Sequence, residues 1–201
     1  MSLLKKPAQT SRDVHELIRD RWSPRAFDAG KPVSRDAVIS MLEAARWAAS
    51  SNNVQPWRFI VATRDNEAAH AQAVSGFNVR NQRWAKNAPV LIFALARTVN
   101  DAGQPNGAAF YDTGAAVAQL VLQATALGLV VHQAGGIEKD HIRAAYKVPE
   151  DTEVMVGIAI GYQADASVLP EDLPEREIAP RTRKAMSDLV FAGAYGETAR
   201  L

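Results

Sequence analysis

The sequence predicts one α/β domain with a sheet of about four strands, flanking helices and an extended C-terminal arm. Three observations support this prediction. Amphipathic segments alternate along the chain with apolar runs of strand length. No internal repeat or low-complexity tract interrupts this alternation. Residues 162–201 hold Pro170, Pro174 and Pro180, several charges and only one apolar cluster, which is too little to bury for a separate domain.

Apolar residues at helical spacing, several with a capping residue ahead of them, predict the helices. The first begins at Asp13 and ends near Trp22, because Pro24 disfavours helix at the residue before it. The segment Gly114–Leu127 is the strongest helix, apolar on several faces, and Gly128 provides its C-terminal stop. The other helices are expected at residues 34–48, 66–74, 81–86 and 138–146.

Four runs rich in apolar and β-branched residues predict the strands, at Trp57–Thr63, Val90–Ala96, Leu129–His132 and Val154–Ile160. The last run has no polar alternation, which is typical of a central strand. Between the second strand and the strongest helix lies the loop Thr98–Tyr111, and loops of that length often line a site.

Composition excludes several functional classes. The 201 residues include no cysteine, which excludes disulfides, thiolate metal sites and a cysteine nucleophile. A net charge of +1 is too small for a field that attracts nucleic acid or anionic membranes, so an anion site must be local. No apolar run reaches the roughly 18 to 20 residues of a membrane span, and no secretory signal opens the chain, so a cytoplasmic location is expected.

The usual phosphate, metal and nucleophile motifs are missing as well. There is no Gly-x-Gly-x-x-Gly turn, no P-loop and no Gly-x-Ser-x-Gly elbow. The four histidines lack metal-ligand spacing, so no metal is expected. His132, at the end of a strand, is either a proton donor or, as is commoner, a residue that only hydrogen-bonds a neighbour.

Two cationic segments are candidates for an anion site. Arg21, Ser23 and Arg25 alternate in an extended stretch and should project to one side, where guanidinium groups match phosphate oxygens. Residues 180–184, Pro-Arg-Thr-Arg-Lys, form a second cationic strip. Each strip taken alone is more often a solvated surface patch.

Three further segments allow a functional and a structural interpretation. The polar stretch Ser50–Trp57 either contacts the polar edge of a planar ring or is a helix cap and turn. Gly135 and Gly136 either admit a ligand close to the backbone or make a strand-to-helix turn. Asp112 and Thr113 are expected to cap the long helix.

Together these segments resemble the nitroreductase family of flavin mononucleotide (FMN) oxidoreductases. The stretch Ser50-Ser51-x-Asn53-x-Gln55-Pro56-Trp57 is the most diagnostic. The other matching features are Arg21-x-Ser23-x-Arg25-x-Phe27, Ala44-Ala45-Arg46, Ala88-Pro89, Leu127-Gly128-Leu129, Gly135-Gly136, Gly157-x-x-x-Gly161 and Arg181-x-Arg183-Lys184. The resemblance implies an α+β fold with a mixed central sheet. It also implies that residues 1–161 form an FMN-binding domain and that residues 162–201 form an arm over the partner of a homodimer.

The resemblance further implies a role for each candidate residue. The FMN phosphate would be held by Arg21, Ser23, Arg25, Arg181 and Arg183. From the other subunit, the flavin would be approached by Ala49, Ser50, Ser51 and Asn53. The pyrimidine edge would be contacted by Asn81, with Arg80 as its competitor. Backbone N–H groups of Gly135 and Gly136 would face flavin N5 and O4. Family members often have proline in place of Ala49, and many have an acidic residue in place of Gly135.

As for activity, the resemblance implies ping-pong hydride transfer from NAD(P)H to a nitroaromatic, a quinone or a similar small electron-poor acceptor. No side chain need act as an acid or base, because hydride moves directly between nicotinamide, flavin and acceptor. Two alternatives stay open. The same pocket could serve reductive dehalogenation or flavin destruction, or the chain could be a non-redox dimeric module that holds an anion. Neither nucleic acid nor a membrane is expected as a partner.

Overall fold

A computed structural model describes residues 3–170 and 172–199 of the chain. Its centre is a four-stranded sheet in the order β1-β2-β4-β3. The strands are β1 (Trp57–Thr63), β2 (Val90–Arg97), β3 (Val130–Ala134) and β4 (Thr152–Gly161). β4 lies between β2 and β3, so its prediction as a central strand is confirmed.

All three strand pairings in the described ranges are antiparallel, which differs from the mixed sheet that the resemblance implied. The physical reason lies at the edge of the sheet. β3 pairs with β4 on one side only, and the described chain supplies no fifth strand that could run parallel to it. Within one chain the fold is therefore α+β with an antiparallel sheet.

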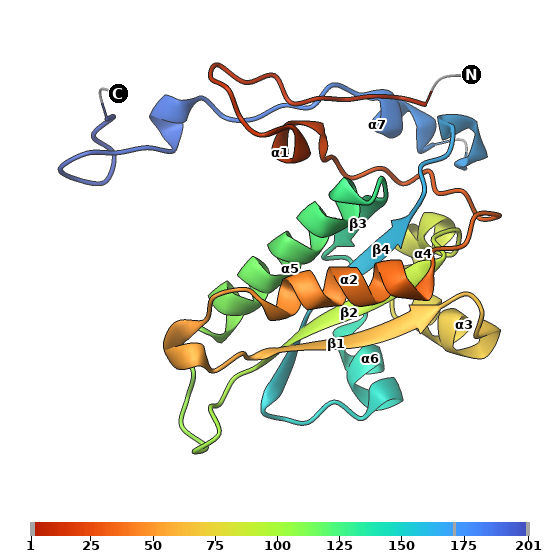
Figure 1. Cartoon of the computed structure of the whole chain (residues 1–201), viewed down its shortest axis with the longest axis horizontal. Coiled ribbons are helices and arrows are strands. Elements are labelled where there is room, and N and C mark those ends of the chain that lie inside the picture. The colour runs from red at the N-terminus through yellow and green to blue at the C-terminus, as the bar shows by residue number, and fades with distance from the viewer. Residues whose placement is uncertain (1–2, 171, 200–201) are drawn as a thin grey trace.

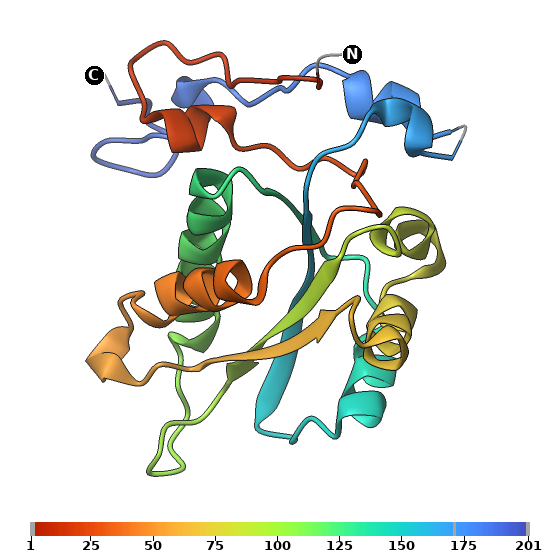
Figure 2. The same cartoon turned by 45° about the vertical axis from the view of Figure 1, so that its right-hand side comes forward.

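The part of the chain that the structure describes contains seven helices, of which α1 and α7 lie beyond one end of the sheet (Figures 1 and 2). α2 and α5 pack against each other on one face, and α3, α4 and α6 lie on the other face (Figures 1 and 2). The helices are α1 (Glu16–Asp20), α2 (Arg35–Arg46), α3 (Glu67–Ser75), α4 (Val79–Ala85), α5 (Ala109–Ala126), α6 (Lys139–Tyr146) and α7 (Pro174–Ile178). Three short 3₁₀ turns are η1 (Ser51–Asn53), η2 (Ala166–Val168) and η3 (Met186–Asp188).

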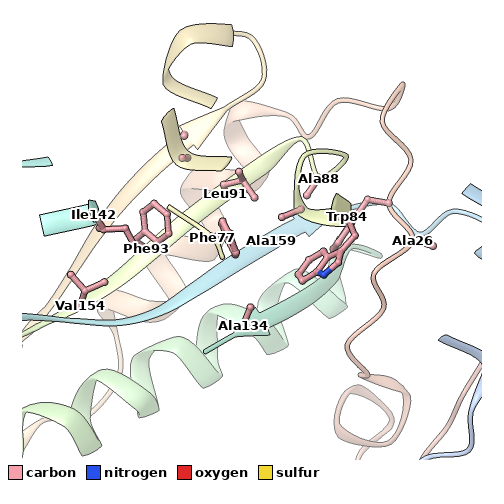
Figure 3. Packing of buried hydrophobic residues seen from close by; sticks show 14 of the residues in the cluster. Ala26, Phe77, Trp84, Ala88, Leu91, Phe93, Ala134, Ile142, Val154 and Ala159 are labelled. Carbon is pink, nitrogen blue, oxygen red and sulfur yellow. The ribbon is translucent and has the colours of Figure 1, made fainter. Parts of the chain in front are cut away.

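The alternation of side chains along β2 divides the core into two clusters, one on each face of the sheet. Leu91, Phe93 and Leu95 point to the face of α3, α4 and α6, where Phe77 and Trp84 are completely buried (Figure 3). The intervening residues of β2 point to the opposite face and pack with α2 and α5. Because β2 is buried on both faces, it has a continuous apolar sequence although its neighbours are antiparallel.

The helix boundaries differ from the predicted ones mainly at α1 and α5. α1 is shorter than predicted, since its N-cap is His15, whose Nδ1 accepts the Leu17 N–H. α5 begins at Ala109, five residues earlier than predicted, so the expected loop ends in a helical turn. Asp112 and Thr113 therefore lie inside α5 and are buried, and the prediction that they cap it is wrong.

After β4 the chain crosses to the end of the molecule where α1 and the N-terminal segment lie (Figure 1). Residues 172–199, which include α7 and η3, run beside that segment and then away from the sheet (Figures 1 and 2). Ile178, Met186, Leu189 and Tyr195 are between 55% and 95% exposed. This segment thus has apolar side chains that its own chain leaves uncovered. None of the described helices is long and apolar enough to cross a membrane.

Candidate functional site: a cationic pocket beside the edge strand

Two segments near the N-terminus and one segment from the C-terminal part of the chain meet in a small pocket of about 210 Å³. They are the N-terminal segment, the extended stretch after α1, and the C-terminal segment around α7. Six of the eight lining residues are cationic. The lining consists of Lys6, Arg21, Trp22, Ser23, Arg25, Arg176, Arg181 and Arg183. We call it the cationic pocket.

The alternation predicted for Arg21, Ser23 and Arg25 is seen in the structure. All three are half-buried and line the cationic pocket, whereas Trp22 and Pro24 between them are buried. The Arg21 guanidinium Nη1 donates to Ser23 Oγ over 3.3 Å, which orients both side chains on one side of the strand-like segment. The sequence pattern therefore predicted this half of the pocket correctly.

The charges of the cationic pocket are poorly balanced by the protein itself. Among the described residues, the only ion pair of these cations is the long contact of 3.9 Å between Arg25 and Glu177. Burial, reinforced by the charges of Arg181 and Arg183, lowers the pKa of Arg21. Burial also lowers the pKa of Arg25 and of Lys6. Half-buried guanidinium groups that repel one another are stabilised by an anion, so this donor set fits a phosphate group.

A second candidate region lies at the end of β3, where Gly136 meets α4. The Gly136 carbonyl accepts the Asn78 backbone N–H at 3.0 Å and the Asn81 side-chain N–H at 2.9 Å. A Cβ atom on Gly136 would lie 2.5 Å from Nδ2 of both Asn78 and Asn81, so a larger residue there would displace these two side chains. In the described chain neither the Gly135 nor the Gly136 amide donates a hydrogen bond, which leaves both N–H groups available. Arg80, the competing candidate, is exposed on α4.

His132 connects this region to the cationic pocket. Its Nδ1 lies 3.1 Å from the Pro24 carbonyl oxygen, which can only accept, so Nδ1 carries the proton. The ring packs on Trp84 at a centroid distance of 4.4 Å, and Trp84 in turn donates to Asn81. Burial, reinforced by the charge of Arg25, lowers the pKa of His132 to about 4. His132 is therefore a neutral group that holds the Arg21–Arg25 stretch against β3.

The titration of His132 predicts how stability depends on pH. In the unfolded chain His132 is protonated below its usual pKa of 6.5, whereas in the folded protein it is protonated only below about pH 4. Its contribution is therefore complete above pH 6.5 and is lost as the pH falls towards 4. Between pH 7 and pH 5 the loss should be roughly 2 kcal/mol.

Urea denaturation of wild type and His132→Gln at these two pH values measures this loss. The pH dependence of the unfolding free energy should be smaller in the variant by that amount. Burial also lowers the pKa of His70, but His70 is present in both proteins and cancels in the comparison. Equal pH dependence in the two proteins would contradict the assignment.

The turn around η1 lies beside the N-terminal end of α5, whereas α1 and the stretch that follows it lie towards the other end of that helix (Figures 1 and 2). Ala49, Ser51 and Asn53 are exposed and Ser50 is half-buried. The Ser51 N–H donates to the buried Asp112 carboxylate at 3.0 Å, which fixes the turn on α5.

The backbone of this turn is strained. Asn52, Asn53 and Gln55 all have φ near +50°, a conformation that L residues rarely adopt. Backbone strain of this kind persists only where surrounding structure enforces it, and it is concentrated at functional sites. The Ser50 hydroxyl, which accepts the Gln55 N–H at 3.0 Å, is one such constraint.

The separation between the turn and the cationic pocket follows from the length of α5. Asp112 anchors the turn, whereas Thr125 lines a cavity that shares Lys6, Arg21 and Trp22 with the cationic pocket. Thirteen residues of helix between Asp112 and Thr125 span about 20 Å. The structure therefore brings the arginines together, and Asn81 together with Gly136, but it keeps Ala49–Asn53 apart from both.

Sequence reasoning missed several residues of this region. Lys6 and Arg176 line the cationic pocket, and Glu177 is buried beside it. These residues stand in polar segments with no apolar periodicity, so no sequence signal distinguishes them from solvated charges. Asn78 could have been found, because an asparagine before a short helix is a typical N-cap, and its side chain accepts the Asn81 N–H.

These features define an α+β protein with an antiparallel sheet and a cluster of cationic side chains around one pocket at the end near its edge strand. The family model of the Nitroreductase family matches residues 18–162. The chain is 31% identical to the "Uncharacterized 15.4 kDa protein in ask 5'region" of Mycolicibacterium smegmatis, over 69% of this chain and 97% of that protein. It is 32% identical to the oxygen-insensitive NAD(P)H nitroreductase of Enterobacter cloacae, over 44% of this chain and 42% of that enzyme.

The crystal structure of an oxidoreductase containing FMN superposes with a TM-score of 0.88 at 40% identity and covers 94% of this chain and 96% of the other. The match of the family model extends over most of the chain, from α1 to the residue after β4. This chain belongs to the nitroreductase family, as its sequence motifs predicted.

Proposed function

We propose that this protein is an FMN-dependent oxidoreductase that takes electrons from NAD(P)H and passes them, by a ping-pong mechanism, to a small electron-poor acceptor such as a nitroaromatic or a quinone. The observation that supports this most directly is the cationic pocket, with six cationic residues around a volume that suits one phosphate. The FMN content of the similar oxidoreductase and the NAD(P)H nitroreductase activity of the Enterobacter relative point to the same cofactors.

In the proposed site the phosphate of FMN is held by the side chains of Arg21, Ser23, Arg25, Arg181 and Arg183. Arg181 also donates to the carbonyls of Lys6 at 2.7 Å and Arg19 at 3.0 Å, so its guanidinium is held in place without a counter-ion. When bound, FMN would supply two-electron chemistry, through which a hydride equivalent would pass from the nicotinamide to the acceptor.

The end of β3 orients the other end of the cofactor. His132 fixes Pro24 against β3, and Gly135 follows three residues later, about 10 Å along a strand. The N–H groups of Gly135 and Gly136, which donate to no described residue, would donate to flavin N5 and O4 and would stabilise negative charge there. Asn81 is the proposed contact of the pyrimidine edge, although its amide nitrogen already donates to Gly136.

We infer that the site is completed by a second copy of the chain in a homodimer. One chain keeps Ala49, Ser50, Ser51 and Asn53 at the opposite end of α5 from its own cationic pocket, so these residues are proposed to contact the flavin bound by the partner. The segment 162–201 is proposed to lie over the partner. The partner would then bury the side chains that one chain leaves exposed, namely Ile178, Met186, Leu189 and Tyr195. In this division residues 1–161 form the FMN-binding body.

Residues 1–2, 171 and 200–201 lie outside the described residues. A cytoplasmic location remains a prediction from the sequence.

The absorbance spectrum of the purified protein tests the proposed function. A yellow protein, or a colourless one that takes up FMN, is expected, and anaerobic NADH or NADPH should bleach the flavin. Subsequent addition of a nitroaromatic or a quinone should restore the colour. Failure of both nicotinamides to bleach bound FMN would refute the oxidoreductase proposal in favour of another use of the same pocket. Failure to bind FMN at all would leave a non-redox anion-binding module.

A further inference from the structure

Glu177 is a buried acidic residue beside a pocket that is otherwise cationic. It lies on α7 and is 1% exposed. Its carboxylate accepts the Arg25 backbone N–H at 2.8 and 3.0 Å and the Ala26 N–H at 3.1 Å. The Arg25 guanidinium lies farther away, at 3.9 Å. The carboxylate is therefore directed mainly at the backbone of the Arg25 stretch and only weakly at a counter-ion.

The backbone of Glu177 forms a second connection. Its carbonyl oxygen accepts a hydrogen bond of 2.7 Å from Nζ of Lys6. The Lys6 carbonyl in turn accepts from Arg181. The N-terminal segment, the Arg21–Arg25 stretch and the C-terminal segment thus meet at this one residue, and each of the three contributes cations to the pocket.

We propose that Glu177 is a positioning residue that sets the cationic pocket for the phosphate of FMN and joins the seating of α7 to cofactor binding. This inference rests on the proposed function. It adds a residue that the sequence motifs did not include. It also makes the position of Arg25 depend on the C-terminal segment, through the hydrogen bonds that Glu177 accepts from the Arg25 amide.

The direction in which FMN affinity changes when Glu177 is removed distinguishes a positioning role from a purely electrostatic one. A negative charge close to a phosphate site repels the ligand, so on charge alone the removal of Glu177 should tighten FMN binding. If Glu177 instead aligns the Arg25 backbone, its removal leaves two buried N–H groups without their acceptor and moves the guanidinium. FMN binding should then become weaker although the pocket has become more positive.

Two variants separate charge from length, and a third serves as a matched control. Glu177→Gln removes the charge and turns an amide N–H towards a backbone donor. Glu177→Asp keeps the charge but is one methylene too short to reach both amides. Glu175→Gln removes the same charge from the same helix at an exposed position. The dissociation constants of FMN and of riboflavin, which has no phosphate, are measured by fluorescence quenching on full-length protein stripped of flavin.

Both Glu177 variants should raise the FMN dissociation constant by about tenfold or more, the scale of one charge-assisted hydrogen bond, and leave that of riboflavin nearly unchanged. Glu175→Gln should behave as wild type. Tighter or unchanged FMN binding in Glu177→Gln overturns the inference, and so does an equal loss for both flavins, which a merely structural role would produce.

Circular dichroism shows which variants fold. If only Glu177→Asp folds, its ratio of FMN to riboflavin affinity decides the question. If neither folds, Glu177 belongs to the structural core and the inference is overturned. Wild-type protein that binds neither flavin would instead contradict the proposed function, so the two failures are distinguishable.

Discussion

Replacement of both Arg21 and Arg183 by alanine should weaken FMN binding by up to about 6 kcal/mol, because each guanidinium contributes a charge-assisted hydrogen bond of about 1.5–3 kcal/mol. Each single variant should lose about half of this amount. The effect should not be fully additive, since the two arginines would share one phosphate and are already coupled: burial, together with the charges of Arg181 and Arg183, lowers the pKa of Arg21.

Titration of the flavin-free variants with FMN measures this loss. Arg12→Ala is the control, because Arg12 is exposed and donates only to the neighbouring Ser11 carbonyl. The control should bind FMN as wild type does. Unchanged affinity in both single variants would refute the assignment of these arginines to the phosphate.

Substitution of Phe77 by alanine should reduce the free energy of unfolding by about 3–5 kcal/mol. The ring is completely buried and lies 5.6 Å from the Phe93 centroid and 6.3 Å from the Trp84 centroid. The structure around it has little freedom to collapse into the space, because the ring packs between α3, α4 and the sheet (Figure 3). Chemical denaturation of wild type and variant measures the loss.

A second substitution at Gly157 tests whether the cavity is the cause. A Cβ atom on Gly157 would lie 2.7 Å from the Phe77 ring, so Gly157→Ala alone should be destabilising. In the Phe77→Ala background the same methyl group enters vacated space and should cost less, although Ile137 still lies 2.9 Å away. Strict additivity of the two changes would contradict this packing.

The sequence predicted the strands well because they have strong local signals. β1 has the predicted bounds, and β2 and β4 extend the predicted runs by one to three residues. The start of α5 was missed because its first turn, around Phe110 and Tyr111, has no apolar face, and these two side chains are 53% and 83% exposed. Its position is set by a long-range contact, that of Asp112 with Ser51, which no local pattern reveals.

The candidate site shows the same division between local and long-range information. The alternation of Arg21, Ser23 and Arg25 is a local property of an extended chain and was predictable. The hydrogen bond between the Glu177 carboxylate and the Arg25 amide joins residues more than 150 positions apart, and the sequence around neither residue predicts it. The hydrogen bond from Asn81 to Gly136 was not predicted, because the family resemblance implied only that both residues lie near the flavin and neither segment alone specifies a contact.

The length of α5 has a genetic consequence if the site is shared between two chains. In a hybrid dimer, one chain with a defective cationic pocket and one with a defective η1 turn would together retain one complete site of two. Both defects on a single chain, paired with a wild-type chain, would damage both sites. A site built within one chain would give the reverse pattern. The separation of about 20 Å along α5 between Asp112 and Thr125 therefore predicts that the two defects are tolerated on different chains but not on the same chain.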